Sequence, residues 1–192
     1  MPEYTNYNEY LENIGLVLKE GASILCLNSN ADITRPGPYC EERKTLVSAN
    51  SVGALRSIII TGSKQFGIGT MGSILRIAGG EFSTLRAAQM IDAGELEKGD
   101  ISGWLELVKF DFKNWGYGIL TPESVEDGRI VVKLDESMSS AGIPNLGQSV
   151  CYYEGGRITG GLSQITGDKW QFVETNCWGR GDKFCRFEIT KI

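Results

Sequence analysis

CYYEGGRITGGLSQITGDKWQFVETNCWGRGDKFCRFEI, from Cys151 to Ile189, is the stretch of sequence that decides the fold of this chain. It contains three of the five cysteines. From Cys151 to about Ile165, apolar and small residues recur at steps of three and four, which predicts an amphipathic helix. Its inward-facing stripe comprises Cys151, Gly155, Ile158, Leu162 and Ile165. Cys151 therefore points toward the core from the first turn, where the free backbone amides favour a thiolate.

Two strands joined by a glycine-rich turn are predicted after this helix. The helix ends at residues 167–168, and the alternation of apolar and polar residues over 170–175 is typical of a half-buried strand. Residues 179–182, Gly-Arg-Gly-Asp, favour a turn, and the alternation over 185–190 predicts a returning strand. The hairpin brings the cysteine before the turn and the cysteine after it toward each other.

Four side chains of this segment form a candidate metal site. Glu174 shares a strand face with two aromatic residues, where a bare carboxylate is costly to desolvate and needs a cation or several donors. Three thiolates and one carboxylate suit Zn²⁺, and a site filled by four protein ligands is structural. We predict one Zn²⁺ held by Cys151, Glu174, Cys177 and Cys185. Two alternatives stay open: inert buried thiols beside a surface glutamate, and a disulfide between Cys177 and Cys185.

The same segment resembles the 4-vinyl reductase domain family. The resemblance rests on a helix opening at Cys151, the strand phrase VETNC, a glycine-rich turn and the phrase FCRFEI. Members include the aromatic-sensing domains of bacterial phenol-responsive activators, and Bet3-type subunits of vesicle-tethering complexes share the fold. In the sensing members a zinc ion is held by Cys, Glu, Cys and Cys at the spacing seen here from Cys151 to Cys185. The resemblance covers residues 45–192 and is specific from about Trp104 onward.

The resemblance also implies a ligand and an oligomeric state. The sensing members bind phenolic compounds between helices and sheet, and their N-terminal part contributes to a dimer. A homodimer that binds a small apolar or aromatic molecule is therefore the expectation for this chain. One residue that grips the phenol hydroxyl in those sensors is a histidine, and this chain contains none, so phenol itself is not the expected ligand.

Composition excludes several classes of partner. The 192 residues carry a net charge of −5 and contain no basic run, which argues against nucleic acid or an anionic membrane as the main partner. There is no stretch of eighteen uninterrupted apolar residues, and the N-terminus lacks the pattern of a signal peptide. Five cysteines at uneven spacing fit a reducing compartment, so a cytoplasmic protein is expected.

The absence of histidine narrows the chemistry further. Without histidine there is no Ser-His-Asp triad, no Cys-His pair and no histidine-ligated catalytic zinc. The sequence also lacks a GxGxxG fingerprint after a strand and a GxxxxGK[ST] loop. The glycines of residues 62–73 fit a packing segment at the start of a helix better than a phosphate loop, because apolar residues lie among them.

The chain divides into an N-terminal extension, residues 1–44, and a domain, residues 45–192. In the extension, segments on either side of Glu20-Gly21 predict a hairpin, which is marginal alone and must pack on the domain or on a second copy of the chain. We interpret it as a dimerisation arm. Cys26 and Cys40 lie here and are interpreted as ordinary thiols, with a redox pair left open.

The domain before the C-terminal segment reads as helices followed by two strands. Ser51 is a candidate cap of a helix to about Thr61, and Ser102 of a helix carrying Trp104. Between them, two helices separated by Gly79-Gly80 are predicted over 68–77 and 81–93. Segments 117–120 and 129–134 predict an antiparallel pair. The result is an α+β fold: a helical N-terminal half packed on a four-stranded antiparallel sheet, with a helix connecting two β-hairpins.

A ligand pocket is predicted next to the glycine-rich helix. The glycines at 155, 156, 160 and 161 disfavour a helix by about 1 kcal/mol each relative to alanine, which indicates that something approaches the helix closely. Tight packing of the helix on the sheet is one explanation. The other is an apolar cavity for an aromatic or hydrocarbon molecule, lined by Trp104, Ile130, Val132, Gly155 and Phe172.

Three functions are compatible with these features. The first is a non-catalytic sensor or carrier of a small apolar ligand with a structural zinc site. The second, suggested by the family name, is an enzyme or accessory factor in tetrapyrrole 4-vinyl reduction, although no motif for a redox cofactor is visible. The third is a scaffold like the vesicle-tethering relatives.

Overall fold

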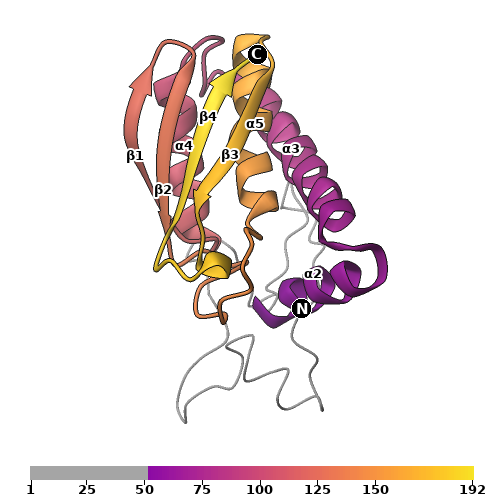
Figure 1. Cartoon of the computed structure of the whole chain (residues 1–192). Coiled ribbons are helices and arrows are strands. Elements are labelled where there is room, and N and C mark those ends of the chain that lie inside the picture. Colours follow the sequence, from indigo (N-terminus) through magenta and orange to yellow (C-terminus); the bar gives the residue numbers. More distant parts are fainter. Residues whose placement is uncertain (1–51) are drawn as a thin grey trace.

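The computed structural model describes residues 52–192, which Figure 1 shows in colour. The predicted hairpin and dimerisation arm of residues 1–44, the thiols of Cys26 and Cys40 and the Ser51 cap lie outside the described residues. In chain order the elements are α2 (Val52–Phe66), α3 (Ile68–Asp92), α4 (Ile101–Asn114), β1 (Ile119–Glu126), β2 (Arg129–Asp135), α5 (Tyr152–Thr166), β3 (Trp170–Asn176), the short 3₁₀-helix η1 (Trp178–Arg180) and β4 (Cys185–Lys191).

The strands form one four-stranded sheet in the order β1-β2-β4-β3, and every neighbouring pair is antiparallel. The hairpins β1–β2 and β3–β4 join at the centre of the sheet, and α5 connects them along the chain. This arrangement confirms the predicted α+β class and the helix between two hairpins. The strand β1 extends over Ile119–Glu126 and is longer than the predicted segment 117–120.

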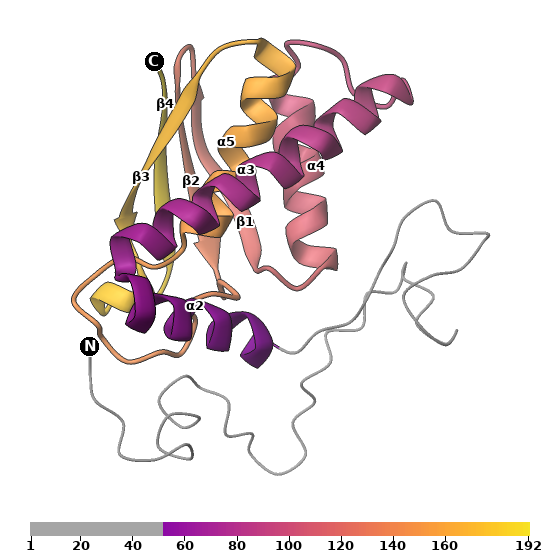
Figure 2. The same ribbon diagram turned by 90° about the vertical axis from the view of Figure 1, so that its right-hand side faces the viewer.

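The helices lie on one side of the sheet (Figures 1 and 2). Helices α4 and α5 pack against the sheet, and α3 packs across α5. The core fills the space between α4, α5 and the sheet, where each large apolar side chain contributes about 1.5–3 kcal/mol on burial. Its fully buried residues include Trp104, Val108, Phe112, Ile130, Val132, Leu134, Ile158, Leu162, Phe187 and Ile189.

Helix α3 runs without interruption from Ile68 to Asp92, so the prediction of two helices separated at Gly79-Gly80 is wrong. The glycines are needed because α3 and α5 approach closely. A Cβ atom at Gly79 would overlap the carbonyl oxygen of Tyr153, and one at Gly160 would overlap that of Gly80. Helix packing through these contacts offsets the low helix propensity of glycine, and the helix continues.

The start of α4 is set by an aspartate. Asp100 Oδ1 accepts a hydrogen bond of 2.8 Å from Gly103 N, which caps the helix. The predicted cap, Ser102, lies inside the first turn instead.

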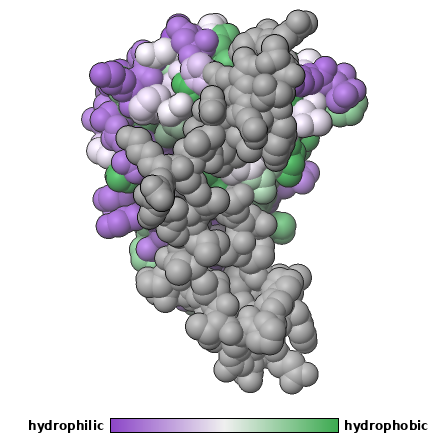
Figure 3. All heavy atoms as spheres, turned by 90° about the horizontal axis from the view of Figure 1, so that it is seen from below, coloured by the Kyte–Doolittle hydropathy of each residue, from purple (hydrophilic) through white to green (hydrophobic). Residues whose placement is uncertain are grey.

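The described surface is mixed in character. Seen from below, hydrophilic residues and separate hydrophobic ones alternate along the visible margin of the described part (Figure 3). Within residues 52–192, none of the helices has the length and apolar character needed to cross a membrane.

Candidate metal centre

The four predicted metal ligands come together at the η1 end of the β3–β4 hairpin. Cys151 is the N-cap residue of α5, Glu174 lies in β3, Cys177 precedes η1 and Cys185 begins β4. Their ligand atoms all lie within 4.8 Å of one another, and all four residues are buried. The structure therefore brings the complete predicted ligand set to one point.

The three sulfur atoms are unbonded but close. Cys151 Sγ lies 3.4 Å from Cys185 Sγ and 3.8 Å from Cys177 Sγ. All three cysteines are free thiols, so the alternative of a disulfide between Cys177 and Cys185 is wrong. Sulfur atoms at a Zn–S distance of about 2.3 Å in a tetrahedral site lie about 3.8 Å apart. The observed separations are therefore close to those of thiolates around one zinc ion.

The turn after β3 positions Cys177. A β-bulge between Glu174 and Asn176 ends the regular pairing of the strand. Asp182 Oδ2 then accepts a hydrogen bond of 2.8 Å from Cys177 N, and this bond lowers the pKa of the Asp182 carboxyl group. Gly179 N donates to Cys177 Sγ at 3.4 Å. An amide donor directed at sulfur stabilises the thiolate form that binds metal.

Two serine hydroxyls also contact the sulfur atoms, and sequence reasoning missed them. Ser140 Oγ lies 3.0 Å from Cys151 Sγ and 3.3 Å from Cys185 Sγ. Ser137 Oγ lies 3.2 Å from Cys151 Sγ. Against a thiolate acceptor the Ser140 hydroxyl donates. The available sequence signal is the run SMSS, Ser137–Ser140, between the end of β2 and Cys151.

The loop that carries these serines is anchored by two buried charged residues. Arg56 of α2 donates from Nε to Met138 O at 2.9 Å and from Nη2 to Ala141 O at 2.7 Å. Glu154 of α5 accepts from Ser137 Oγ at 3.2 Å, and burial raises the pKa of the Glu154 carboxyl group. These contacts fix the serine loop between α2 and α5.

The electrostatics of the cluster favour a cation. Burial raises the pKa of Glu174 to about 9, with a further contribution from the charge of Cys177. Hydrogen bonds from the two neighbouring thiols lower the pKa of Cys177, whereas burial raises that of Cys151. Glu174 Oε2 accepts from Cys151 N at 3.1 Å, but Glu174 Oε1 is buried without a hydrogen-bond partner in the described part of the chain. Without a cation, such a cluster retains protons that a metal ion would replace.

The donor set fits zinc. Three sulfur donors and one carboxylate oxygen, all buried, are the ligand types of a closed tetrahedral Zn²⁺ site, and they are too sulfur-rich for Mg²⁺ or Ca²⁺. Glu174 Oε1, which has no hydrogen-bond partner among residues 52–192, is available as the carboxylate ligand. The cluster is therefore a candidate centre for a structural metal ion.

The five residues predicted to line a ligand pocket lie in two different places in the structure. Trp104, Ile130 and Val132 are fully buried in the core. Trp104 Nε1 donates to Ile158 O at 3.1 Å, and the indole ring occupies the space beside Gly161. Close packing of α5, mainly against other helices, therefore explains its glycines.

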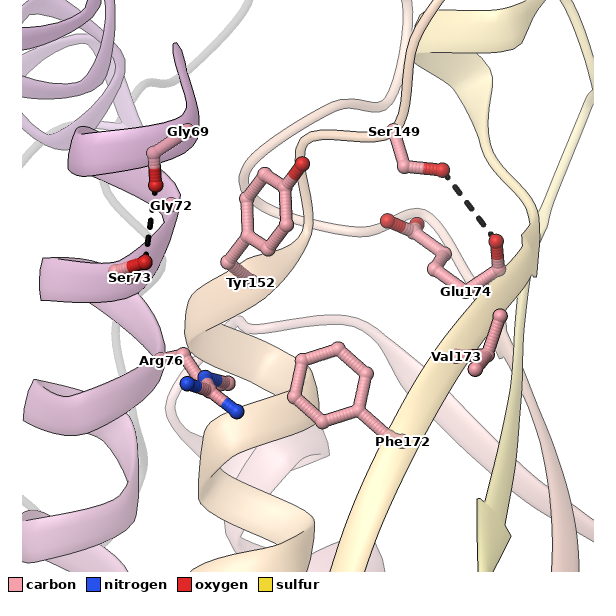
Figure 4. Close-up of a pocket in the computed structure, with 9 residues that line it drawn as sticks. All are labelled: Gly69, Gly72, Ser73, Arg76, Ser149, Tyr152, Phe172, Val173 and Glu174. Atoms are coloured by element: carbon pink, nitrogen blue, oxygen red, sulfur yellow. Dashed lines mark hydrogen bonds between the residues drawn. The ribbon is translucent and has the colours of Figure 1, made fainter. Parts of the chain in front are cut away.

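The other two predicted residues, Gly155 and Phe172, lie next to a pocket on another side of α5. Gly155 contacts the ring of Phe172, and Phe172 lines a pocket of about 400 Å³ between α3, the start of α5 and β3 (Figure 4). The metal-ligand candidate Glu174 lines the same pocket. Arg76 and Tyr152, which sequence reasoning missed, complete much of its wall.

Comparison with known sequences identifies a domain in the C-terminal part. Residues 130–191 match the sequence model of the 4-vinyl reductase domain, which confirms the predicted family resemblance over the segment that holds all four candidate ligands. The uncharacterized protein MJ1642 of Methanocaldococcus jannaschii is 32% identical over 99 residues, which are 51% of this chain and 60% of that protein. The uncharacterized protein MJ0150 of the same organism is 37% identical over 72 residues, 38% of this chain and 42% of that protein. The matches thus span less than two thirds of the length of either relative.

Solved structures share the fold. The phenol-responsive sensory domain of the transcription activator PoxR, solved with phenol, has a TM-score of 0.62 at 18% identity and covers 77% of this chain and 79% of its own. A trafficking protein particle complex subunit 3 from Naegleria fowleri, covalently bound to palmitic acid, has a TM-score of 0.58 at 15% identity and covers 73% of this chain and 92% of its own. An H-NOX protein from S. oneidensis has a TM-score of 0.52 at 12% identity, covering 81% and 84%. At these identities the likeness shows the fold alone.

Proposed function

We propose that the protein is a non-catalytic small-molecule-binding or sensor protein whose C-terminal segment is held together by a structural Zn²⁺. The observation that carries this proposal is the convergence of Cys151, Glu174, Cys177 and Cys185, with ligand atoms within 4.8 Å of one another. A site with four protein ligands leaves no open position for a substrate, which favours a structural role. The ion would tie the start of α5 to both strands of the C-terminal hairpin.

The ligand is an aromatic or hydrocarbon-like small molecule, and the protein acts as a homodimer in the cytoplasm. Support for the ligand comes from the match to the 4-vinyl reductase domain and from the fold shared with a phenol-responsive sensory domain. The pocket beside Glu174 offers a place for such a molecule. Free buried thiols fit a reducing compartment. The dimer rests on the extension of residues 1–44, interpreted from sequence as a dimerisation arm.

Elemental analysis and native mass spectrometry of the purified full chain test the proposal. One zinc ion per chain is expected, and Cys177→Ser should abolish it. The double variant Cys26→Ser, Cys40→Ser is the matched control and should retain zinc, because neither residue belongs to the ligand set. Full zinc content in the double variant Cys151→Ser, Cys185→Ser would overturn the ligand assignment.

The same spectra, with an absorption spectrum, test the small-molecule part. A bound apolar or aromatic molecule, or binding of one on addition, supports the sensor or carrier function. A tightly bound flavin or tetrapyrrole would instead favour the alternative of an enzyme or accessory factor in tetrapyrrole reduction.

A further inference from the structure

The pocket between α3, α5 and β3 combines an apolar wall with two charged groups. The rings of Tyr152 and Phe172 provide the apolar wall (Figure 4). On the α3 side, Gly69 and Gly72 expose backbone, and a side chain at Gly72 would meet the ring of Tyr152. The volume of about 400 Å³ is at the small end of the range of about 300–1,000 Å³ for ligand sites. The pocket is therefore of a size for one small, flat molecule.

The charged groups lie at different parts of the pocket wall. Figure 4 shows the guanidinium of Arg76, from α3, directed across the opening toward Phe172 of β3. Arg76 has no hydrogen-bond or ion-pair partner among residues 52–192. Glu174 is 8% exposed, and its Oε1 is buried without a hydrogen-bond partner among the same residues. Neither group is neutralised by another side chain of the described pocket.

We propose that this pocket binds an aromatic carboxylate, with the ring between Tyr152 and Phe172 and the carboxylate on Arg76. A planar guanidinium presents parallel N–H donors that match the two oxygens of a carboxylate. Aromatic rings pack well against the faces of other aromatic side chains. This inference rests on the proposed small-molecule-binding function and specifies its ligand class and position.

Glu174 fixes the orientation of the ligand. In the zinc-loaded chain Glu174 is ionised, and three thiolates and one carboxylate carry more negative charge than one Zn²⁺ neutralises. A ligand carboxylate placed near Glu174 would therefore be repelled. The anionic group therefore lies at the Arg76 end, and the uncharged ring lies toward Glu174. Because Glu174 also belongs to the candidate metal centre, the ligand lies directly beside the group that would tie β3 to the ion.

The test uses two matched probes and the zinc-loaded full chain at low ionic strength. The probes are 2-naphthoate and its neutral amide, 2-naphthamide, with binding measured by titration calorimetry. A charge-assisted contact predicts that the acid binds about tenfold more tightly than the amide. Arg76→Ala should remove this preference without weakening the amide. Lys98→Ala is the control, because it removes one positive charge from an exposed loop away from the pocket and should change neither affinity.

A second variant tests the position of the ligand. A Cβ atom at Gly69 would meet nothing within 4 Å, so the space beside this backbone position is open to the side chain that Gly69→Leu adds at the pocket wall. Leucine also favours a helix over glycine, so the fold should be retained. Gly69→Leu should weaken both probes by tenfold or more, with zinc content unchanged.

Failure of the inference and failure of the proposed function look different. Equal affinity for acid and amide, or an acid preference that survives Arg76→Ala, overturns the ligand class and leaves small-molecule binding in place. Full affinity in Gly69→Leu overturns the position. Absence of binding of either probe, in a chain that also yields no small molecule in native mass spectrometry, overturns the inference together with the proposed ligand binding.

Discussion

Helix α5 carries two buried clusters of charged groups, which neutralise charge in different ways. In the middle of the helix, Arg157 Nη2 lies 3.4 Å from Asp111 Oδ2. The guanidinium also lies over three aromatic rings, 4.6 Å from the centroid of Phe82, 4.8 Å from that of Tyr117 and 5.2 Å from that of Phe112. This cluster contains both signs of charge and three electron-rich ring faces. The protein itself supplies the opposite charge and the ring faces that offset the buried guanidinium, although Arg157 Nη1 has no hydrogen-bond partner among the described residues.

At the start of the same helix, the clustered groups are three thiols and a carboxylate, all of which become negative on losing a proton. Their hydrogen bonds come from serine hydroxyls and backbone amides. Glu174 Oε1 has no hydrogen-bond partner among residues 52–192. One cluster thus balances its charge within the chain, whereas the other has the composition of a site completed by a cation.

Removal of the metal is expected to have the largest effect on stability. Cys177→Ser, which keeps the size of the side chain but not the thiolate ligand, should lower the free energy of unfolding by more than about 4 kcal/mol. Urea unfolding followed by circular dichroism measures the change. A chelator should destabilise the wild-type chain to a similar extent and have little further effect on the variant. A chelator-insensitive wild type would show that the cluster is stable by itself, like the Arg157 cluster.

Disruption of the Arg157 cluster should have the next largest effect. Arg157→Met leaves Asp111 buried with Arg86, at 3.4 Å, as its one ion-pair partner among residues 52–192. Breaking a buried pair costs about 3–5 kcal/mol, because the remaining charge is uncompensated. Zinc content should stay at one ion per chain, which separates the two clusters.

A double variant checks the reason for that loss. Arg157→Met combined with Asp111→Leu removes both buried charges, and it should recover part of the stability lost in the single variant. A single variant that costs less than about 1 kcal/mol would mean that the aromatic rings alone hold this part of α5 in place.

The Glu174 carboxyl group should contribute to the pH dependence of stability with opposite signs in the metal-free and zinc-loaded chains. In the metal-free chain the pKa of Glu174 is raised from 4.5 to about 9. Between these values the folded state holds a proton on Glu174 that the unfolded state has released, so this group makes stability fall as pH rises, by about 1.4 kcal/mol per pH unit. The lowered pKa of Cys177 acts in the opposite direction. With zinc bound, protons compete with the metal, so stability should fall as pH is lowered.

Urea unfolding at pH 5, 6 and 7, with chelator or with zinc, measures both trends. Glu174→Gln is the matched control, because glutamine has a similar shape and does not titrate. In the metal-free chain this variant should make the slope of stability against pH more positive by about 1.4 kcal/mol per pH unit, leaving the opposing contributions of Glu154 and Cys177. An unchanged slope in Glu174→Gln would contradict the prediction.

The fold of the C-terminal half was predictable because local patterns and tertiary contacts agree there. The helical stripe from Cys151, the two-residue periodicity of β3 and β4 and the glycine-rich turn all have short-range causes. The ligand set followed from residue type, spacing and the family resemblance. Sulfur and carboxylate groups on a helix start and a hairpin have few ways to be buried together.

The features missed from sequence depend on contacts between distant segments. The uninterrupted course of α3 through Gly79-Gly80 depends on the approach of α5, which no local pattern reveals. The serines that contact sulfur lie in a loop whose position depends on Arg56, more than eighty residues earlier in the chain. The glycines of α5 predict that something approaches the helix closely, and at Gly161 the group that approaches is the indole of Trp104 itself.

The hydrogen bonds around the candidate metal centre provide the finest test of the comparison. Ser140→Ala removes the hydroxyl that contacts Cys151 Sγ at 3.0 Å and Cys185 Sγ at 3.3 Å. Zinc binding is expected to weaken by about 1–3 kcal/mol, because the thiolates lose a hydrogen-bond donor. Competition with a chromophoric chelator measures the change.

Ser139→Ala is the matched control in the same loop, because the Ser139 hydroxyl is buried but has no hydrogen-bond partner within the described part of the chain. The control should leave zinc affinity unchanged. A shift of the sulfur-to-metal absorption band of the cobalt-substituted protein in Ser140→Ala alone would place the effect at the thiolates, which a general loosening of the loop would not do. Equal losses in both variants would contradict this assignment. The difference in zinc affinity between Ser140→Ala and Ser139→Ala thus measures how much one hydroxyl donor stabilises thiolate charge that no side chain of the cluster neutralises.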